Sequence, residues 1–156
     1  MSAVVHTLHV ILAGAWLGGV VFTTAVVSPA LKAMKWSEAE RVLVRSTIGK
    51  QYVRVGTANL LLLSVFAVLD GLLLGFGPVF YVEYALLAVV FGLVAAHGAY
   101  FGRRLVRLAE AERHVGSAEE ARAFAEERHA LQRLSSKVSW ADILVSLAVA
   151  ALAVNV

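Results

Sequence analysis

The sequence contains no cysteine, and only two prolines and two methionines occur among its 156 residues. The lack of cysteine excludes a disulfide framework, a zinc ribbon, an iron–sulfur cluster and a thiol nucleophile. Met1 and Met34 are too few for the methionine-lined path that copper(I) would use. Charge is scarce as well, since Asp, Glu, Lys and Arg make up 16% of the chain, against about a quarter in soluble domains. The composition therefore argues against an ordinary soluble enzyme.

Apolar residues, in contrast, make up 60% of the chain, which is far more than a disordered chain carries. They gather in four stretches, at about residues 3–31, 55–74, 79–101 and 138–156. Each stretch approaches or exceeds the ~20 residues that cross a hydrocarbon core of ~30 Å. A segment isolated in lipid must satisfy its own backbone hydrogen bonds. The sequence therefore predicts an all-α fold, with residues 1–156 forming one integral membrane four-helix bundle.

The positive charges predict how this bundle lies in the membrane. All fourteen Lys and Arg residues fall between the first and second apolar stretches or between the third and fourth. Positively charged loops stay in the cytoplasm, so both termini and the turn at 75–78 are expected outside the cell (inner) membrane, an N-out/C-out topology. This distribution also favours contact with anionic lipid over binding of nucleic acid.

The two charged blocks differ in length. The first is expected to be a short amphipathic connector over residues 32–50, following a helix that ends near Pro29, because proline disfavours helix at the preceding residue. The second, residues 102–137, is expected to form a cytoplasmic helical hairpin. In it the third helix runs on to about His114, and Gly116 breaks it. Ser117 and Glu120 then form a capping box that starts a new helix.

Within the hairpin, the new helix is expected to end near Leu134, and Ser135–Ser136 to restart the chain into the fourth membrane helix. No repeat or second domain is visible. In the first helix, two pairs of small residues have the spacing of close helix packing, Gly14 with Gly18 and Ala15 with Gly19. We therefore expect this helix to be the central packing helix of the bundle.

Ionisable residues inside membrane spans are costly and are candidates for function. Counting along the helices places four of them near the outer face, where they are expected to converge: His6, His9, Asp70 and Glu83. His6 and His9 are three residues apart and share a helix face, so the four side chains could ligate a metal. The alternative places His6 in the aqueous interface and only His9 in the bundle.

A second group is expected near the cytoplasmic ends of the helices and consists of Asn59, His97 and Asp142. His97 paired with Asp142 would tie the third helix to the fourth. The same two residues would equally suit a proton relay or a second ligand site, and the sequence leaves these alternatives open.

The first helix carries a pattern that resembles one family. The segments are Leu8-His9-Val10-Ile11, Ala15-Trp16-Leu17-Gly18-Gly19-Val20-Val21-Phe22 and Ser28-Pro29-Ala30-Leu31. They are similar to the CopD-like superfamily, which includes the copper-resistance protein D family, the HemJ type of protoporphyrinogen oxidase and small four-helix membrane proteins. The likeness is greatest to the last group and covers about the first 75 residues.

The resemblance implies a role for His9. In the HemJ type the corresponding histidine is taken to ligate haem b, and in the copper-resistance type it is linked to copper uptake from the outer side. We expect His6, Trp16 and Gly18 beside His9 in a haem pocket, since Trp16 shares its face and glycines leave room for a flat ligand. The later HemJ motifs are absent, so porphyrinogen oxidation is not expected.

Three functions follow in order of preference. The first is a b-type haem protein with a redox role. The second is binding or transport of copper or another divalent metal by His6, His9, Asp70 and Glu83, and the third is a non-catalytic assembly partner. The expected partners are the lipid bilayer, a membrane redox protein and further copies of the chain. No nucleophile–base set or phosphate-binding loop indicates an enzyme acting on a soluble substrate.

Overall fold

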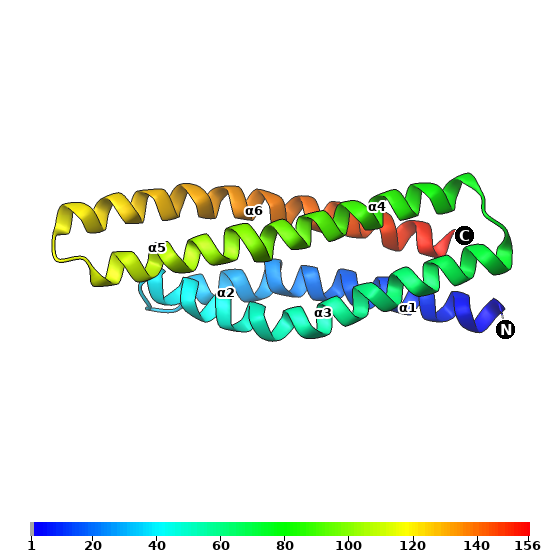
Figure 1. Cartoon of the computed structure of the whole chain (residues 1–156). Helices are drawn as coiled ribbons and strands as arrows, with labels where there is room; N and C mark the ends of the chain where they lie inside the picture. The colour runs from blue at the N-terminus through cyan, green and yellow to red at the C-terminus, as the bar shows by residue number, and fades with distance from the viewer. Residues whose placement is uncertain (1) are drawn as a thin grey trace.

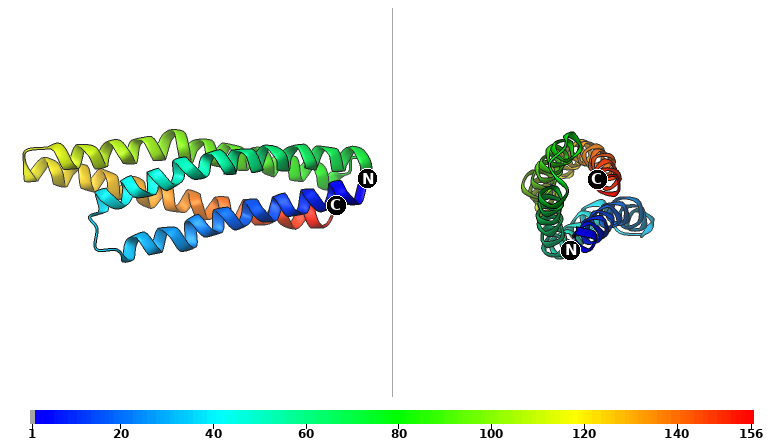
Figure 2. Two further views of the ribbon diagram at one scale, coloured as in Figure 1. Left: turned by 90° about the horizontal axis from the view of Figure 1, so that it is seen from below. Right: turned by 90° about the vertical axis from the view of Figure 1, so that its right-hand side faces the viewer.

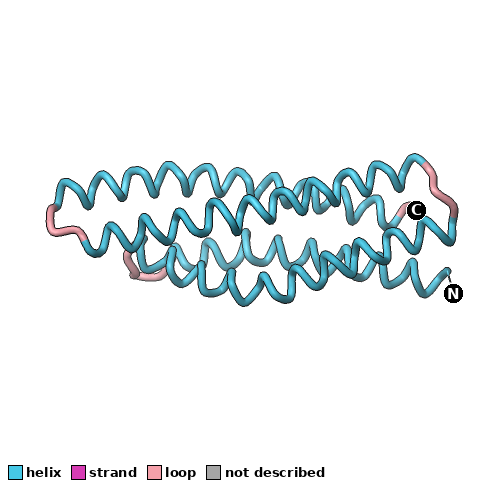
Figure 3. The backbone as a smooth tube through the Cα atoms, in the orientation of Figure 1, coloured by secondary structure: helices cyan, strands magenta, loops and turns pink. Residues whose placement is uncertain are grey.

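A computed structural model describes residues 2–156, and within that range it contains helices and short connections but no strand (Figures 1 and 3). Its elements are α1 (Ser2–Val21), the π-helix η1 (Phe22–Val27), α2 (Ser28–Ala33), α3 (Glu38–Leu74), α4 (Pro78–Ala95), the π-helix η2 (Ala96–Gly102), α5 (Arg103–His114) and α6 (Ala118–Val154). The first three elements form one continuous helical rod, and so do α4, η2 and α5. The chain is therefore a bundle of four long rods.

All four rods are long and apolar enough to cross a membrane, and they are Ser2–Ala33, Glu38–Leu74, Pro78–His114 and Ala118–Val154. Over the most apolar 18 residues of each rod, only 17 to 28% of the residues are buried. Large apolar side chains such as Leu72 and Leu144 are more than 60% exposed. An apolar surface on every side of the bundle suits lipid rather than water, which agrees with the multi-pass membrane fold expected from the sequence.

The two ends of the bundle differ. Both termini and the loop Gly75–Gly77 lie at one end, here named the terminal end (Figure 1). The connections Met34–Ser37 and Val115–Ser117 lie towards the other, here named the connector end. Figure 2 shows α2 diverging from the other helices towards the connector end. Which end faces the cytoplasm stays a prediction from the positive charges.

The prediction that the first helix ends near Pro29 is wrong, because helix continues to Ala33. Proline lacks an N–H and its ring collides with the carbonyl four residues earlier in a regular α-helix. Here the π-helix Phe22–Val27 immediately precedes Ser28 and Pro29. Its wider i→i+5 turns change the backbone positions that face the proline ring. The rod passes through Pro29 and stops at Met34, which is extended.

The connector expected over residues 32–50 is also shorter than predicted, since α3 begins at Glu38 and runs for 37 residues. A capping box at Ser37 explains this start. Ser37 Oγ accepts from the backbone N–H of Glu40, and the Glu40 carboxylate accepts from the N–H of Ser37. Such a reciprocal cap satisfies two backbone donors at a helix N-terminus. The motif Ser-Glu-Ala-Glu was visible in the sequence and could have predicted it.

The helical hairpin is confirmed. Helix α5 ends at His114, Gly116 lies in the connection, and Ser117 Oγ accepts from the N–H of Glu120 at the start of α6. The restart predicted at Ser135–Ser136 does not occur, because α6 is one uninterrupted helix of 37 residues. A serine inside a helix can donate to the carbonyl four residues earlier without breaking it, as Ser139 does to Ser135.

Two apolar clusters form the interior. The larger lies towards the terminal end and consists of Ala13, Trp16, Val20, Leu60, Leu63, Ala67, Leu87, Val90, Val149 and Ala153. The smaller lies at the connector end and consists of Ala39, Val42, Phe101, Leu105 and Ala109. The bundle is therefore packed with apolar side chains towards both ends.

Of the small residues of α1, Gly14 and Gly18 do not pack against a neighbouring helix as predicted, whereas Gly19 does. A methyl group at Gly14 or Gly18 would have no other atom within 4 Å, and both residues are exposed. Gly19 instead approaches α3, where the phenol of Tyr52 occupies the space beside it and beside Gly56. The spacing indicated small residues on one face, but it could not say which face meets the bundle.

Candidate metal centre

Three helices bring their ionisable residues together at the terminal end. His6 and His9 lie on α1, Asp70 lies near the end of α3, and Glu83 lies near the start of α4. Nδ1 of His6 and Nδ1 of His9 both face one carboxylate oxygen of Asp70, at 2.8 and 3.1 Å. Nε2 of His9 lies 2.8 Å from Oε1 of Glu83. The predicted convergence of these four side chains is therefore present.

This cluster is shielded from solvent. His9, Asp70 and Glu83 are 0% exposed, whereas the His6 side chain keeps 32% of its surface exposed. The remaining carboxylate oxygens, Oδ1 of Asp70 and Oε2 of Glu83, are buried without a hydrogen-bond partner. A buried polar atom without a partner is costly and calls for an explanation. His6 thus provides the side of the cluster that faces outward.

The donor atoms of three residues suit a metal ion. One atom each from His6, His9 and Asp70 can be chosen so that all three lie within 4.8 Å of one another. Ligand atoms at ~2.0–2.1 Å from a tetrahedral ion would lie about 3.3 Å apart. The distances from Nδ1 of His6 and Nδ1 of His9 to Oδ2 of Asp70 would have to increase by only a few tenths of an ångström.

Glu83 does not belong to the same donor group, although the sequence placed it among the ligands. Glu83 contacts Nε2 of His9, whereas Asp70 faces Nδ1 on the other side of the ring. A carboxylate in that position accepts from Nε2–H, fixes the tautomer and directs the Nδ1 lone pair towards the ion. Glu83 is therefore placed to orient His9 rather than to ligate beside it.

Of the two residues expected beside His9 on α1, Trp16 shares its buried face and Gly18 does not. Trp16 is buried two turns further along the same face, and its indole N–H donates to Ser146 on α6 at 2.9 Å. It packs below the cluster and has no hydrogen bond with it. Gly18 is exposed, because nine residues from His9 correspond to half a turn around an α-helix. The expected placement of Gly18 in a pocket with His9 is therefore wrong.

The second predicted group does not assemble. Asn59 donates to the carbonyl of Leu12 at 3.1 Å, and the nearest polar partner of Asp142 is Ser146 at 3.4 Å. Among the described residues His97 makes no hydrogen bond with Asp142; its ring packs beside Phe101. Counting residues gave similar depths for the three, but the depth of a residue does not fix the direction it faces around its helix. The predicted tie between His97 and Asp142 is wrong.

Sequence reasoning missed an aromatic group above the cluster. Phe76 of the loop Gly75–Gly77 packs against three rings near the start of α4, those of Phe80, Tyr81 and Tyr84. The hydroxyl of Tyr84 donates to the carbonyl of Ala67 on α3. These contacts hold α4 to α3 next to Asp70 and Glu83. The density of aromatic residues over 76–84 was the available signal.

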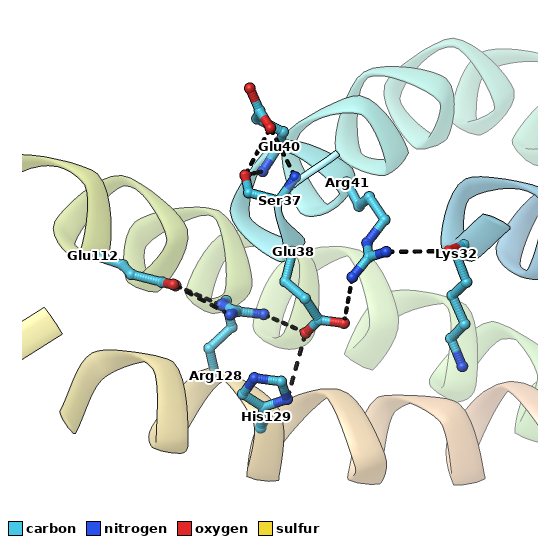
Figure 4. Close-up of polar contacts among 8 residues, drawn as sticks. All are labelled: Lys32, Ser37, Glu38, Glu40, Arg41, Glu112, Arg128 and His129. Carbon is cyan, nitrogen blue, oxygen red and sulfur yellow. Dashed lines mark hydrogen bonds and ion pairs between the residues drawn. The ribbon is translucent and has the colours of Figure 1, made fainter. Parts of the chain in front are cut away.

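A second ionic cluster lies at the connector end and was also missed (Figure 4). Arg128 of α6 is 1% exposed. It donates to Glu112 of α5 at 2.7 Å and to Glu38, the first residue of α3, at 2.8 Å. Glu38 also receives a hydrogen bond from Arg41, and His129 lies 3.4 Å from it. Arg128 therefore joins the hairpin to the start of α3.

The electrostatics of Glu38 agree with this arrangement. It lies outside the apolar stretch of α3, and its partial burial alone would raise the pKa of the carboxyl group. The hydrogen bond from Arg128 and the nearby charges of His129, Arg128 and Arg41 outweigh burial, so the pKa of Glu38 lies below its ordinary value. The carboxylate is therefore the form that the fold stabilises.

One family model matches the chain, described as a domain of unknown function, DUF4149, and it covers residues 11–114. The match includes Asp70 and Glu83, and it begins just after His9. No curated protein and no solved structure matches the sequence. The likeness to the CopD-like superfamily stays a prediction. Because the family model covers well over half of the chain, this four-helix protein belongs to the DUF4149 family.

Proposed function

We propose that the protein binds a divalent transition-metal ion at the terminal end of its bundle, with His6, His9 and Asp70 as ligands. The observation that carries this proposal is the approach of two histidine nitrogens to one aspartate oxygen, with their donor atoms within 4.8 Å of one another. Imidazole and carboxylate together suit zinc, nickel, copper(II) and iron. Three protein ligands leave one tetrahedral position for water or substrate.

Charge supports the same proposal. The carboxylates of Asp70 and Glu83 are both 0% exposed, and no Lys or Arg contacts either among the described residues. Negative charge buried without compensation is strongly unfavourable. A divalent cation with two neutral histidines and these two carboxylates would make the buried site neutral. The outward-facing ring of His6 offers such an ion a route of entry.

Haem, the first preference from the sequence, has less support from this geometry. Both nitrogens of His9 face carboxylates, so an iron atom would have to displace either Asp70 or Glu83. The His9 ring has no exposed surface against which a porphyrin could lie. The residues present therefore do not fit haem.

The proposal is tested by titrating metal-free protein in detergent with Zn²⁺ and measuring heat or competition with a metal indicator. One ion per chain is expected, with binding lost in His9→Ala and in Asp70→Asn. The matched control is His129→Ala, which alters a half-exposed histidine at the opposite end and should leave binding intact. Absence of binding for Zn²⁺, Ni²⁺, Co²⁺ and Cu²⁺ would overturn it. A Soret absorption band that only His9→Ala removes would instead favour haem.

A further inference from the structure

The two apolar clusters are separated by a level at which the side chains are at most partly buried. Between Val20 and Leu31 on the first rod no residue is buried, and the same holds for residues 43–55 of α3. It also holds for residues 91–100 of α4 and η2 and for residues 136–145 of α6. All four rods therefore hold only partly buried or exposed side chains over these segments.

Polar side chains line this level. Five of the half-buried ones are named the polar belt: Arg45, Tyr52, His97, Ser139 and Asp142. Tyr52 lies near Asp142, and Arg45 lies near His97. Ser139 and Asp142 lie one turn apart on α6. The belt brings together residues from three rods, over about two turns of α3.

The polar belt has too few partners within the protein. The Nε atom of Arg45 is buried and has no hydrogen-bond partner among the described residues. The carboxylate of Asp142 has one contact, with Ser146 at 3.4 Å, which is longer than a good hydrogen bond. An unpaired Asp in a membrane helix costs about 2.5–3.5 kcal/mol at the centre of the bilayer. Ordered water is the usual partner of polar groups left without protein contacts.

The backbone at this depth is irregular as well. The π-helix η2 contains His97 of the belt. Tyr52 of the belt packs against Gly19, and the π-helix η1 begins three residues after that glycine. π-helical turns occur frequently at functional sites. Above the belt, the hydrogen bond from Trp16 to Ser146 and the larger apolar cluster separate it from His9. The belt is thus a place distinct from the candidate metal centre.

We propose that the polar belt holds water, and that the carboxylate of Asp142 binds a cation there. The geometry that supports this is a carboxylate without a cationic partner, at a level where the side chains are at most partly buried. This second site does not depend on the metal centre at the terminal end.

The absence of native cysteine allows a direct test. Ser139→Cys places one thiol in the belt, a turn from Asp142. Leu144→Cys is the matched control, because Leu144 lies two residues beyond Asp142 but is 66% exposed on the lipid-facing side of α6. Each variant is placed in phosphatidylcholine vesicles, with cationic or anionic methanethiosulfonate on both faces. Circular dichroism and monodisperse elution confirm that both variants fold.

The thiol at position 139 should react with the charged reagents, at least several-fold faster with the cationic one, and the thiol at position 144 should not react. Adding Asp142→Asn to Ser139→Cys should remove the preference for the cationic reagent while reaction continues. No reaction at position 139 would overturn the water-filled belt. Equal rates for the two reagents, or a preference that persists with Asp142→Asn, would overturn the cation site.

Discussion

Nε2 of His9 lies 2.8 Å from Oε1 of Glu83, and neither side chain is exposed. The two residues are 74 positions apart in the sequence and come from different rods. The contact occupies one nitrogen of the imidazole and leaves the other facing Asp70 and His6. A single pairing thus decides which atom of His9 is available for chemistry at the terminal end.

The first prediction concerns that pairing. Glu83→Gln keeps the size and a hydrogen-bonding oxygen but removes the charge that supports His9. We expect metal affinity to fall by about 10–100-fold, as is typical for residues that orient a ligating histidine, rather than to vanish as in His9→Ala. Competition with a metal indicator measures the difference. Complete loss of binding in Glu83→Gln would mean that Glu83 is itself a ligand, and unchanged affinity would mean that it has no role.

The second prediction compares two neighbouring glycines. A side chain at Gly19 would collide with the Tyr52 hydroxyl, whereas nothing lies within 4 Å of one at Gly18. Gly19→Ala should therefore destabilise the bundle by about 1–3 kcal/mol, the usual cost of overpacking. Gly18→Ala should be neutral or stabilising by up to about 1 kcal/mol, because alanine favours helix. Thermal unfolding in detergent compares them.

Adding Tyr52→Phe to Gly19→Ala removes the oxygen that collides and should recover part of the lost stability. If the two glycine variants were equally stable, Tyr52 would not occupy the space beside Gly19, and the packing of α1 on α3 would need revision.

The third prediction is a pH dependence from the connector end. The folded-state pKa of Glu38 lies below its ordinary value, 4.5. The stabilisation is therefore fully present above pH 4.5 and is lost as the pH falls through the lower folded-state pKa. The free energy of unfolding, measured between pH 7 and pH 3, should fall in the native chain as the pH is lowered. It should fall less in Glu38→Gln.

Arg128→Gln should abolish the same acid-dependent contribution, since it removes the main partner of Glu38. Glu119→Gln, in the first turn of α6, is the control and should follow the native profile. If Glu38→Gln and Arg128→Gln both lost as much stability in acid as the native chain, other carboxyl groups would be the cause.

The fourth prediction concerns orientation in the membrane. If the connector end is cytoplasmic, a cysteine at position 2 or 76 should react with an impermeant thiol reagent added to intact cells. A cysteine at position 118, in the hairpin, should be protected until the cells are opened. The native chain has no cysteine and provides the blank. Labelling of position 118 from outside would contradict the orientation inferred from the positive charges.

The sequence by itself determined the four helices, because the apolar stretches are as long as a bilayer is thick and the polar residues gather between them. Gly116 and Ser117 determined the hairpin through local backbone preferences and capping. Residue counting along straight helices was enough to place His6, His9, Asp70 and Glu83 at one depth. These features depend on short segments of chain, and short-range physics governs them.

Only the tertiary structure decided which way each residue faces. It placed Glu83 on the far nitrogen of the His9 ring and separated His97 from Asp142. It also brought Arg128 to Glu38 across 90 positions of sequence. The rotation of a helix about its axis depends on how all four rods pack together. Apolar composition on every side of a membrane helix leaves no strong hydrophobic periodicity from which that rotation can be predicted.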